Sequence, residues 1–546
     1  MRLSRLFLLL VLAGLLLPVL MVLGAWWQAD ARSIEVLQGM AQTVLPDYAV
    51  SSLLLCTWVL VGVVSLGTAS AVAVTLFEFR GRRVLEWALL LPLAMPAYVV
   101  AYAYTDFLQF SGPAQTWLRQ GWGLQGRVLP EIRSLWGAAC VLALTLYPYV
   151  YLLARAALTE RATHLMEAAR LLGAPLSRRI REVALPLARP AIAAGAALAM
   201  METLADYGVS SYFGIQTFTT GIYKAWLVME DRMAAAQLST LLLGVVLVVL
   251  GVERHAQSRL RFAASRAAER SREAQPVRLQ GGGQLLAQGV CLMPVLLGFV
   301  VPVILLLQAL WASGDAIDWP WGRFLEWTWN SFRLGLMTAV LAAAAASWLA
   351  FEARRQPRGP VTWAVQGVGL GYAVPGAVIV VGLLLPVGWV QGRWPDWGVG
   401  SWVTATLLGV LWAYLVRFVA VALQSVQSGY ARIPASLDES ARMLGTSWPR
   451  LWRVVHWPLM RRPLAAAVLL VLVDVMKELP ATLVLRPFNT DTLAVMAYQL
   501  ARDERLGEAA LPSLALVLVG LLPVMLLSRA LRGTSTDGRS ARHEPN

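Results

Sequence analysis

Charged residues are scarce in this chain: they make up 14% of its 546 residues, against about 25% in soluble domains. Hydrophobic residues make up 58%, and the mean hydropathy is +0.61. Such a low fraction of charged residues together with such a high fraction of apolar residues is typical of an integral membrane protein. The net charge of +14 therefore does not indicate a nucleic-acid partner, and we expect the lipid bilayer as its surroundings.

Cysteine, histidine and lysine are also few. The three cysteines, Cys56, Cys140 and Cys291, stand far apart in apolar runs, which argues against a disulfide framework or a metal set. The four histidines show no metal-ligand spacing. The two lysines, Lys224 and Lys477, follow no glycine-rich phosphate loop. We therefore expect no cofactor, no catalytic residues and no ATP hydrolysis in this chain, and a metal site stays unknown.

Apolar runs long enough to cross a bilayer, roughly 20 residues each, fall into two sets of six. The first set lies near 4–27, 50–78, 85–106, 132–158, 191–213 and 234–252, and the second near 285–311, 330–354, 361–390, 400–425, 463–483 and 508–530. We predict an all-α integral membrane protein with about twelve transmembrane helices in two parallel six-helix repeats. The first run exceeds a signal-peptide core in length, so we expect an uncleaved anchor.

The polar segments predict the domain boundaries and the orientation. We expect an N-terminal half over 1–252, a basic cytoplasmic linker over 253–283, a C-terminal half over 284–530 and a cytoplasmic tail over 531–546. Most Lys and Arg fall on the side of the linker and the termini, which the positive-inside rule places in the cytoplasm.

One short pattern occurs twice, in loops 160–190 and 430–463. In each copy a Gly follows a Glu by six residues, and a Pro follows the Gly by thirteen. We expect a short helix that ends at the Gly and a second helix that the Pro ends, lying on a surface or in a partner's groove. The positions concerned are Glu167, Ala168, Ala169, Gly173 and Pro186 in the first copy and Glu439, Ala441, Gly445 and Pro458 in the second.

This pattern resembles the EAA loop of ABC importer permeases, the segment that docks on the ATP-hydrolysing subunit. The second copy departs from it at Ser440, which replaces the middle Ala, and at Trp457 before the Pro. The resemblance implies two copies of a separate ATPase on the cytoplasmic side, charge contacts from Glu167 and Glu439, and turns at the two glycines. The alternative is a pair of ordinary amphipathic surface hairpins.

The span after each loop carries two carboxylates four residues apart. These are Glu202 with Asp206 in the first half and Asp474 with Glu478 in the second, so we expect each pair to share a helix face. A lipid-facing carboxylate at depth costs about 2.5–3.5 kcal/mol, so we expect all four to face the bundle interior. They are candidates for lining a translocation pathway, and the alternative is local capping or neutralisation by Lys477.

Each half also has a proline inside its third span, Pro96 in the first and Pro375 in the second. A proline inside a helix removes one hydrogen bond and kinks the chain. We predict kinks at both, as candidates for a gate.

Longer stretches carry a more specific resemblance. Residues 201–208 with 216–223, and residues 477–483 with 486–488 and 491–494, look like the two halves of fused ferric-iron ABC importer permeases. This resemblance implies a bacterial inner-membrane permease that takes iron from a periplasmic binding protein and alternates access under a separate ATPase. A thiamine or other small-solute permease shares the two-half plan, and an ion-coupled secondary transporter is the alternative of another class.

Overall fold

The computed structural model of the protein describes residues 2–28, 31–159, 163–267, 276–313, 321–357 and 359–536. The all-α prediction is confirmed, because helices make up nearly all of the regular structure in these ranges. The two strands found there, β1 (Phe77–Glu78) and β2 (Val277–Arg278), pair in parallel with Phe77 opposite Val277. This pairing ties the end of the basic linker to the end of the second predicted span.

Ten helices in the described ranges are long and apolar enough to cross a membrane, or eleven if one helix pair bent by 91° counts as a single span. We predicted about twelve. The bent pair corresponds to the predicted span 85–106 and breaks between Ala94 and Ala97. The predicted span 463–483 falls on the helix Trp457–Lys477 and the short helix Pro480–Leu485 after it, and it is not among these candidate spans.

The chain divides into two compact units that interleave along the sequence. Unit 1 comprises Met1–Gly39, Ile222–Leu243 and Trp319–Met496, and unit 2 comprises Met40–Gly221, Gly244–Asp318 and Ala497–Asn546. Four of the five unit boundaries fall inside helices, namely α2 (Ala31–Gln42), α12 (Phe218–Tyr223), α13 (Arg232–Ala267) and α25 (Leu493–Arg502). The described start of the predicted linker continues α13 as far as Ala267.

Unit 1 is built on the second half of the chain together with the first predicted span. Its elements are α1 (Arg2–Gly24), η1 (Ala25–Gln28), η5 (Lys224–Val228), α16 (Trp321–Arg355), α17 (Pro360–Val368), η7 (Gly371–Ala373), α18 (Gly376–Arg393), η8 (Pro395–Trp397), α19 (Val399–Thr404), α20 (Leu407–Tyr430), α21 (Ala435–Met443), α22 (Trp448–Leu451), η9 (Trp452–His456), α23 (Trp457–Lys477) and α24 (Pro480–Leu485).

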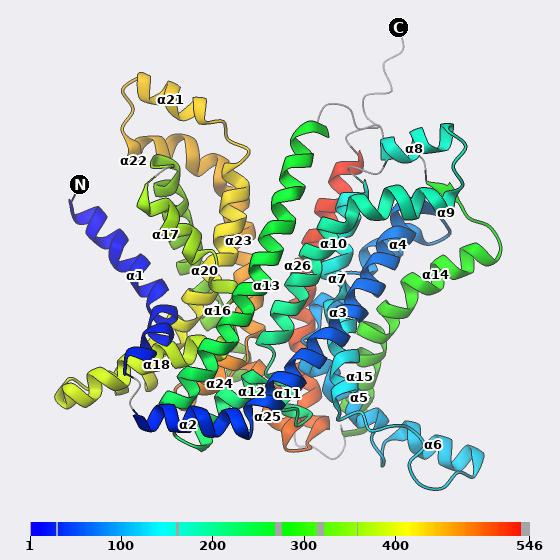
Figure 1. Ribbon diagram of the computed structural model, residues 1–546, viewed down its shortest axis with the longest axis horizontal. Coiled ribbons are helices and arrows are strands. Elements are labelled where there is room, and N and C mark those ends of the chain that lie inside the picture. The colour runs from blue at the N-terminus through cyan, green and yellow to red at the C-terminus, as the bar shows by residue number, and fades with distance from the viewer. Residues whose placement is uncertain are drawn as a thin grey trace. The chain divides into compact units, whose positions relative to one another are not determined.

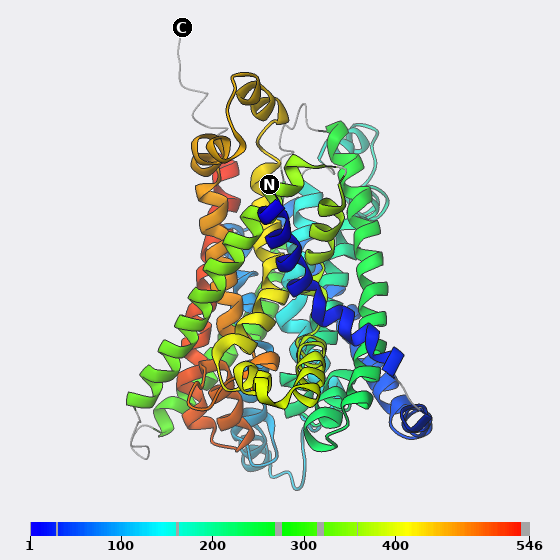
Figure 2. The same ribbon diagram turned by 90° about the vertical axis from the view of Figure 1, so that its left-hand side faces the viewer.

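Helix α1 packs directly on α18 and α20 inside unit 1. A side chain at Gly382 would place its Cβ 2.0 Å from the carbonyl oxygen of Pro18, so only glycine lets the two helices meet there. The indole N–H of Trp412 donates to the carbonyl of Gly14 at 2.7 Å. Figure 2 shows α1, in dark blue, running along the yellow-green helices of the same unit.

Unit 2 is built on the first half of the chain together with the first and last spans of the second half. Its elements are α3 (Leu45–Leu76), β1, α4 (Arg82–Ala88), η2 (Leu91–Ala94), α5 (Ala97–Leu108), α6 (Pro113–Trp122), α7 (Leu135–Ala157), α8 (Thr163–Leu171), α9 (Leu176–Arg179), η4 (Ile180–Ala184), α10 (Leu185–Ala205), α11 (Gly208–Tyr212), β2, α14 (Gly282–Val295), η6 (Leu296–Val300), α15 (Val301–Ser313) and α26 (Leu506–Thr536).

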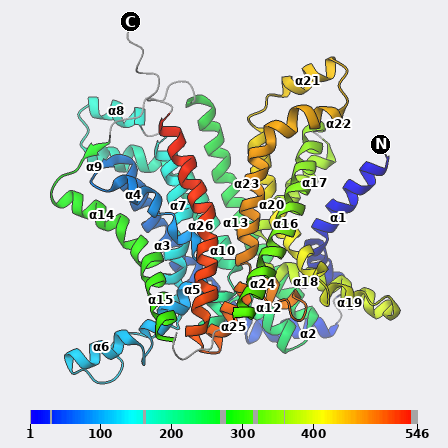
Figure 3. The same cartoon turned by 180° about the vertical axis from the view of Figure 1, so that it is seen from behind.

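Helix α7 lies at the centre of unit 2, between α3 and α10 (Figure 3). Small residues permit this packing: a Cβ at Gly67 of α3 would lie 2.9 Å from the carbonyl oxygen of Tyr147, and one at Gly195 of α10 would lie 2.8 Å from that of Tyr149. Close backbone approach through glycine is typical of helices that pack in a membrane. Helix α10 therefore packs closely on α7, and it also contacts α3 in the core of unit 2.

Candidate functional site

Both copies of the repeated pattern fold into the same hairpin. Helix α8 is followed by Gly173 with φ 79°, and α21 is followed by Gly445 with φ 78°. In each hairpin the glycine N–H donates to the carbonyl three residues back and the next N–H donates to the carbonyl five residues back, at 3.0 and 3.0 Å in the first and 2.9 and 3.1 Å in the second. This is the Schellman ending of a helix, and its left-handed residue explains the glycine.

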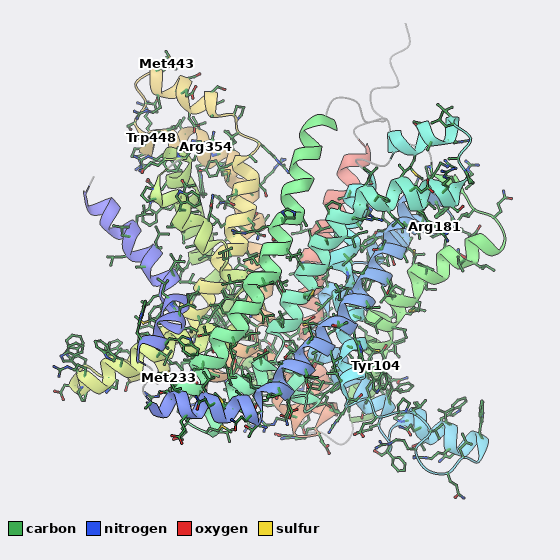
Figure 4. The ribbon with its side chains drawn as sticks, in the orientation of Figure 1. Tyr104, Arg181, Met233, Arg354, Met443 and Trp448 are labelled. Atoms are coloured by element: carbon green, nitrogen blue, oxygen red, sulfur yellow. The ribbon has the colours of Figure 1, made fainter. Side chains whose placement is uncertain are left out.

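The tip of each hairpin carries two bare apolar side chains. Leu171 and Leu172 are 89% and 87% exposed, and Met443 and Leu444 are 90% and 86% exposed. In Figure 4 Met443 lies at the outer end of α21, beyond Trp448 and Arg354 of the same unit. Sequence reasoning missed these four residues. The signal was present, because both copies place an apolar pair directly before the glycine.

The other predicted positions of the two loops lie on the hairpin surfaces. Glu167 and Glu439 are exposed, and so are Ala168 and Pro458. Ala169, Pro186 and Ala441 are half-buried. The glutamates are therefore available to a partner, and their role in binding one stays a prediction.

The prediction that Pro186 and Pro458 end the second helix of each hairpin is wrong. A π-helical turn, η4 in one hairpin and η9 in the other, precedes each proline, and the helix continues as α10 and α23. In the π turn the N–H of Leu185 bonds to the carbonyl of Ile180, five residues back. This wider turn accommodates the missing N–H of proline, as π-bulges commonly do. Each hairpin is therefore continuous with the long helix that follows it in the chain.

The base of the second hairpin is held by buried charges. Arg354, at the end of α16, donates from Nε to Asp438 of α21 at 2.6 Å and from its Nη2 to the carbonyls of Ile433 and Pro434 at 3.0 Å each. The other carboxylate oxygen of Asp438 lies 3.2 Å from Nε2 of His456. Burial is the main cause that lowers the pKa of His456 below its usual value, Arg354 adds to it, and the Asp438 carboxylate opposes it.

The base of the first hairpin has neither a carboxylate nor an imidazole at the positions that correspond to Asp438 and His456. Counting 272 residues back, the distance between the two patterns, Met166 stands for Asp438 and Ala184 for His456. Both are buried, at 7% and 0% exposure. The two hairpins share their turns and tips but are anchored differently, one by apolar packing and the other by a buried ion pair network.

The carboxylates at the far ends of α10 and α23 occupy equivalent positions. Asp206 directly follows α10 and accepts hydrogen bonds from the N–H and hydroxyl of Ser210, at 2.9 and 3.0 Å. Glu478 directly follows α23 and accepts from the N–H of Ala481 at 3.0 Å and from the N–H of Thr482 at 3.1 Å. Each caps the short helix that follows it, α11 or α24.

These caps bear on the predicted pathway. Because Asp206 and Glu478 leave the helix to act as caps, they do not share a helix face with Glu202 and Asp474 as their four-residue spacing predicted. Glu202 and Asp474 are half-buried, and Asp474 acts electrostatically on Lys477. That the four carboxylates line a pathway stays a prediction.

The predicted kinks at Pro96 and Pro375 are present as helix breaks. Pro96 separates η2 from α5, and Pro375 separates η7 from α18, so that each proline follows a short 3-10 helix and caps the next α-helix. The first break bends the chain by 91°. The breaks put extended backbone inside a membrane segment, which is tolerated where protein surrounds it. Their part in gating stays a prediction.

Comparison with known proteins finds membrane transport components. A family model described as the binding-protein-dependent transport system inner membrane component matches residues 63–262. The chain is 26% identical over 533 residues to the Fe(3+)-transport system permease protein FbpB 2 of Haemophilus influenzae, covering 96% of this chain and 97% of that protein. It is 30% identical over 200 residues to a putative 2-aminoethylphosphonate transport system permease protein of Salmonella typhimurium, covering 36% and 72%.

A third relative is the sulfate transport system permease protein CysT of Escherichia coli, 27% identical over 199 residues, covering 35% of this chain and 69% of that protein. The apolar helices, the paired hairpins and the broken spans define a membrane permease. The chain belongs to the family of binding-protein-dependent transport system inner membrane components. It is a transport permease and not an enzyme.

Proposed function

We propose that this chain is the ferric-iron permease of a binding-protein-dependent ABC importer in a bacterial inner membrane. One observation carries the proposal: the similarity to the Haemophilus Fe(3+) permease runs over nearly the whole of both chains, whereas the similarity to the phosphonate and sulfate permeases covers about a third of this one. Iron would come from a periplasmic binding protein, and both termini would lie in the cytoplasm.

We further propose that the two hairpins couple this chain to two copies of an ATPase subunit. Their exposed tips support this, because four nearly bare apolar side chains on protruding hairpins are costly unless a partner covers them. Each hairpin continues without a break into α10 or α23, so a push on a tip moves the far end of a long helix. Closing of the ATPase dimer would thus rock the helices between outward-open and inward-open states.

The substrate is tested by uptake in cells with and without this gene, in a background that lacks other iron and thiamine transporters. We expect the gene to be required for uptake of labelled ferric iron and dispensable for labelled thiamine and sulfate. Loss of thiamine or sulfate uptake with normal iron uptake would overturn the iron assignment and leave the permease assignment intact.

The energy source is tested in the same cells. Deleting the ATPase subunit should abolish iron uptake, whereas collapsing the proton and sodium gradients while ATP is maintained should not. The opposite pair of results would identify an ion-coupled secondary transporter.

The docking role of the tips is tested by replacing Leu171 and Leu172 together with Ser, beside a control in which both become Met. Burying one leucine contributes about 1.5–3 kcal/mol, so the Ser variant should weaken ATPase binding by at least about tenfold. The Met variant keeps the apolar surface and should bind normally. Equal ATPase binding by both variants would show that the tips do not dock.

A further inference from the structure

Tyr102 lies among three other tyrosines in unit 2, and the Asp206 carboxylate acts on it electrostatically. Tyr98 and Tyr102 lie on α5, Tyr212 on α11 and Tyr498 in the part of α25 that belongs to unit 2. The ring centroids of Tyr98 and Tyr102 are 5.7 Å apart, and those of Tyr102 and Tyr212 are 4.6 Å apart. The cluster stands at the end of α10 opposite the first hairpin, where α5 packs on α11 (Figure 1).

Tyr102 is the centre of this cluster. Its side chain is 1% exposed, and its hydroxyl has no hydrogen-bond partner among the described residues. Asp206 and the other three phenols lie within electrostatic range of it. A buried hydroxyl without a partner costs free energy and calls for an explanation.

The chemistry of the cluster suits a hard cation. Phenol and carboxylate oxygens become anionic ligands once they are deprotonated, and hard metal ions select such oxygens over sulfur and imidazole. Asp106 adds a second carboxylate near Tyr212. Arg133, whose guanidinium lies 5.1 Å from the centre of the Tyr212 ring, is paired with Glu504 at 3.5 Å, so part of its positive charge is offset.

In unit 1 the carboxylate that corresponds to Asp206 is paired with a cation. Glu478 stands where Asp206 stands, but Nη1 of Arg417 lies 3.6 Å from its carboxylate and the hydroxyl of Thr482 donates to it at 2.7 Å. The hydroxyl of Tyr414 is hydrogen-bonded to that of Thr482 at 2.6 Å. In unit 2 Asp206 likewise accepts from Ser210, and the hydroxyl of Tyr498 lies 2.8 Å from that of Ser211. The two units differ at Tyr102, whose buried hydroxyl has no hydrogen-bond partner among the described residues.

The tyrosines of α5 also have no counterparts in unit 1. Counting from the proline at each helix break, Ala377 and Val381 of α18 take the places of Tyr98 and Tyr102. Both are buried and apolar, at 1% exposure each. The two halves thus differ at the position where the cluster forms.

We propose that Tyr102 and Asp206, with Tyr98, Tyr212 and Tyr498 around them, bind the ferric ion in transit at one site in unit 2. This inference rests on the proposed iron function. Each tyrosine that becomes a ligand gives its phenol proton to the hydroxide or carboxylate ligand that the ferric ion sheds on entering, and binds through its oxygen, with no change in the oxidation state of iron.

The test is ferric binding by the full-length purified chain in detergent, titrated with ferric citrate. Phenolate bound to ferric iron gives a visible charge-transfer absorption, which reports tyrosine ligation directly. The variants are Tyr102→Phe and a control, Tyr104→Phe, on the same helix, whose hydroxyl donates to the carbonyl of Leu297. Tyr102→Phe removes a hydroxyl without a partner among the described residues, so the chain should fold as before, which thermal unfolding checks.

We expect saturable binding with the visible band in the natural chain and in Tyr104→Phe. Tyr102→Phe should weaken binding by about 10- to 100-fold, the loss typical of altered metal sites, and reduce the band and iron uptake. The same affinity and band in all three proteins, or no saturable band in any, would overturn the site. Iron uptake that does not need the gene would instead overturn the proposed function, and uptake that needs the gene but is unchanged by Tyr102→Phe refutes the site alone.

Discussion

The turn of the second hairpin offers a test whose size follows from its backbone. Gly445 has φ 78°, and a Cβ built on it meets no atom within 4 Å. Replacing Gly445 with Val therefore introduces backbone strain without a clash. A left-handed conformation costs an L-residue roughly 1–2 kcal/mol, which shifts the population of the native hairpin by about 5- to 30-fold.

The assay is binding of the ATPase subunit to the permease in lipid nanodiscs, with Gly445→Asn as the control because Asn tolerates the left-handed region. The Val variant should bind about 5- to 30-fold more weakly, the Asn variant should bind nearly as the natural chain does, and both should insert normally. Gly173→Val should reproduce the loss in the first hairpin, since φ there is 79°. Equal binding by the Val and Asn variants would refute the idea that the turn must be left-handed to present the tip.

Three more outcomes follow from the buried polar groups. Because the pKa of His456 is lowered in the folded hairpin, the unfolded hairpin binds the proton more tightly, and the stability of the hairpin should fall as pH drops below about 6.5. Limited proteolysis across pH 5–8 measures this stability, and a cleavage rate that does not change with pH would contradict the expectation. Arg354→Met leaves Asp438 buried without its main partner and should lower stability by about 3–5 kcal/mol, seen as a lower melting temperature. Glu478→Gln should destabilise the chain by about 1–3 kcal/mol through its lost charged bonds, while Glu202→Gln should stay within about 0.5 kcal/mol; equal melting temperatures would argue against the capping role.

The sequence was informative where structure is decided locally. The two hairpin turns were predicted because a left-handed helix ending depends on one glycine and its immediate neighbours. The helix breaks at Pro96 and Pro375 followed from the missing N–H. The same rule failed at Pro186 and Pro458, where a π turn one residue earlier let the helix continue. A proline therefore marks strain in a helix, and the neighbouring turns decide whether the helix ends.

Features assembled from distant parts of the chain left no such signal. Arg354 reaches Asp438 and His456 across 84 or more positions. The tyrosine cluster joins α5 to a residue of α25, and no spacing in the sequence foretold it. The sequence showed that carboxylates are unusual in an apolar span. Whether each carboxylate caps a helix, forms an ion pair or has no partner depends on residues elsewhere in the chain, such as Arg417 beside Glu478.

The interleaving of the two units has a consequence for how the protein is made. Unit 2 begins with residues translated early, yet α14 packs on α3, and α26, near the end of the described chain, packs on α15 and η2. During synthesis the faces of α3, α15 and η2 that these later helices cover therefore stay exposed in the bilayer until α14 and α26 have been made. Helix α1 likewise has no packing partner until α18 and α20 have been made. A stop codon before α26 would leave uncovered the faces of α15 and η2 on which α26 packs, so a lesion late in the gene would expose helices made much earlier.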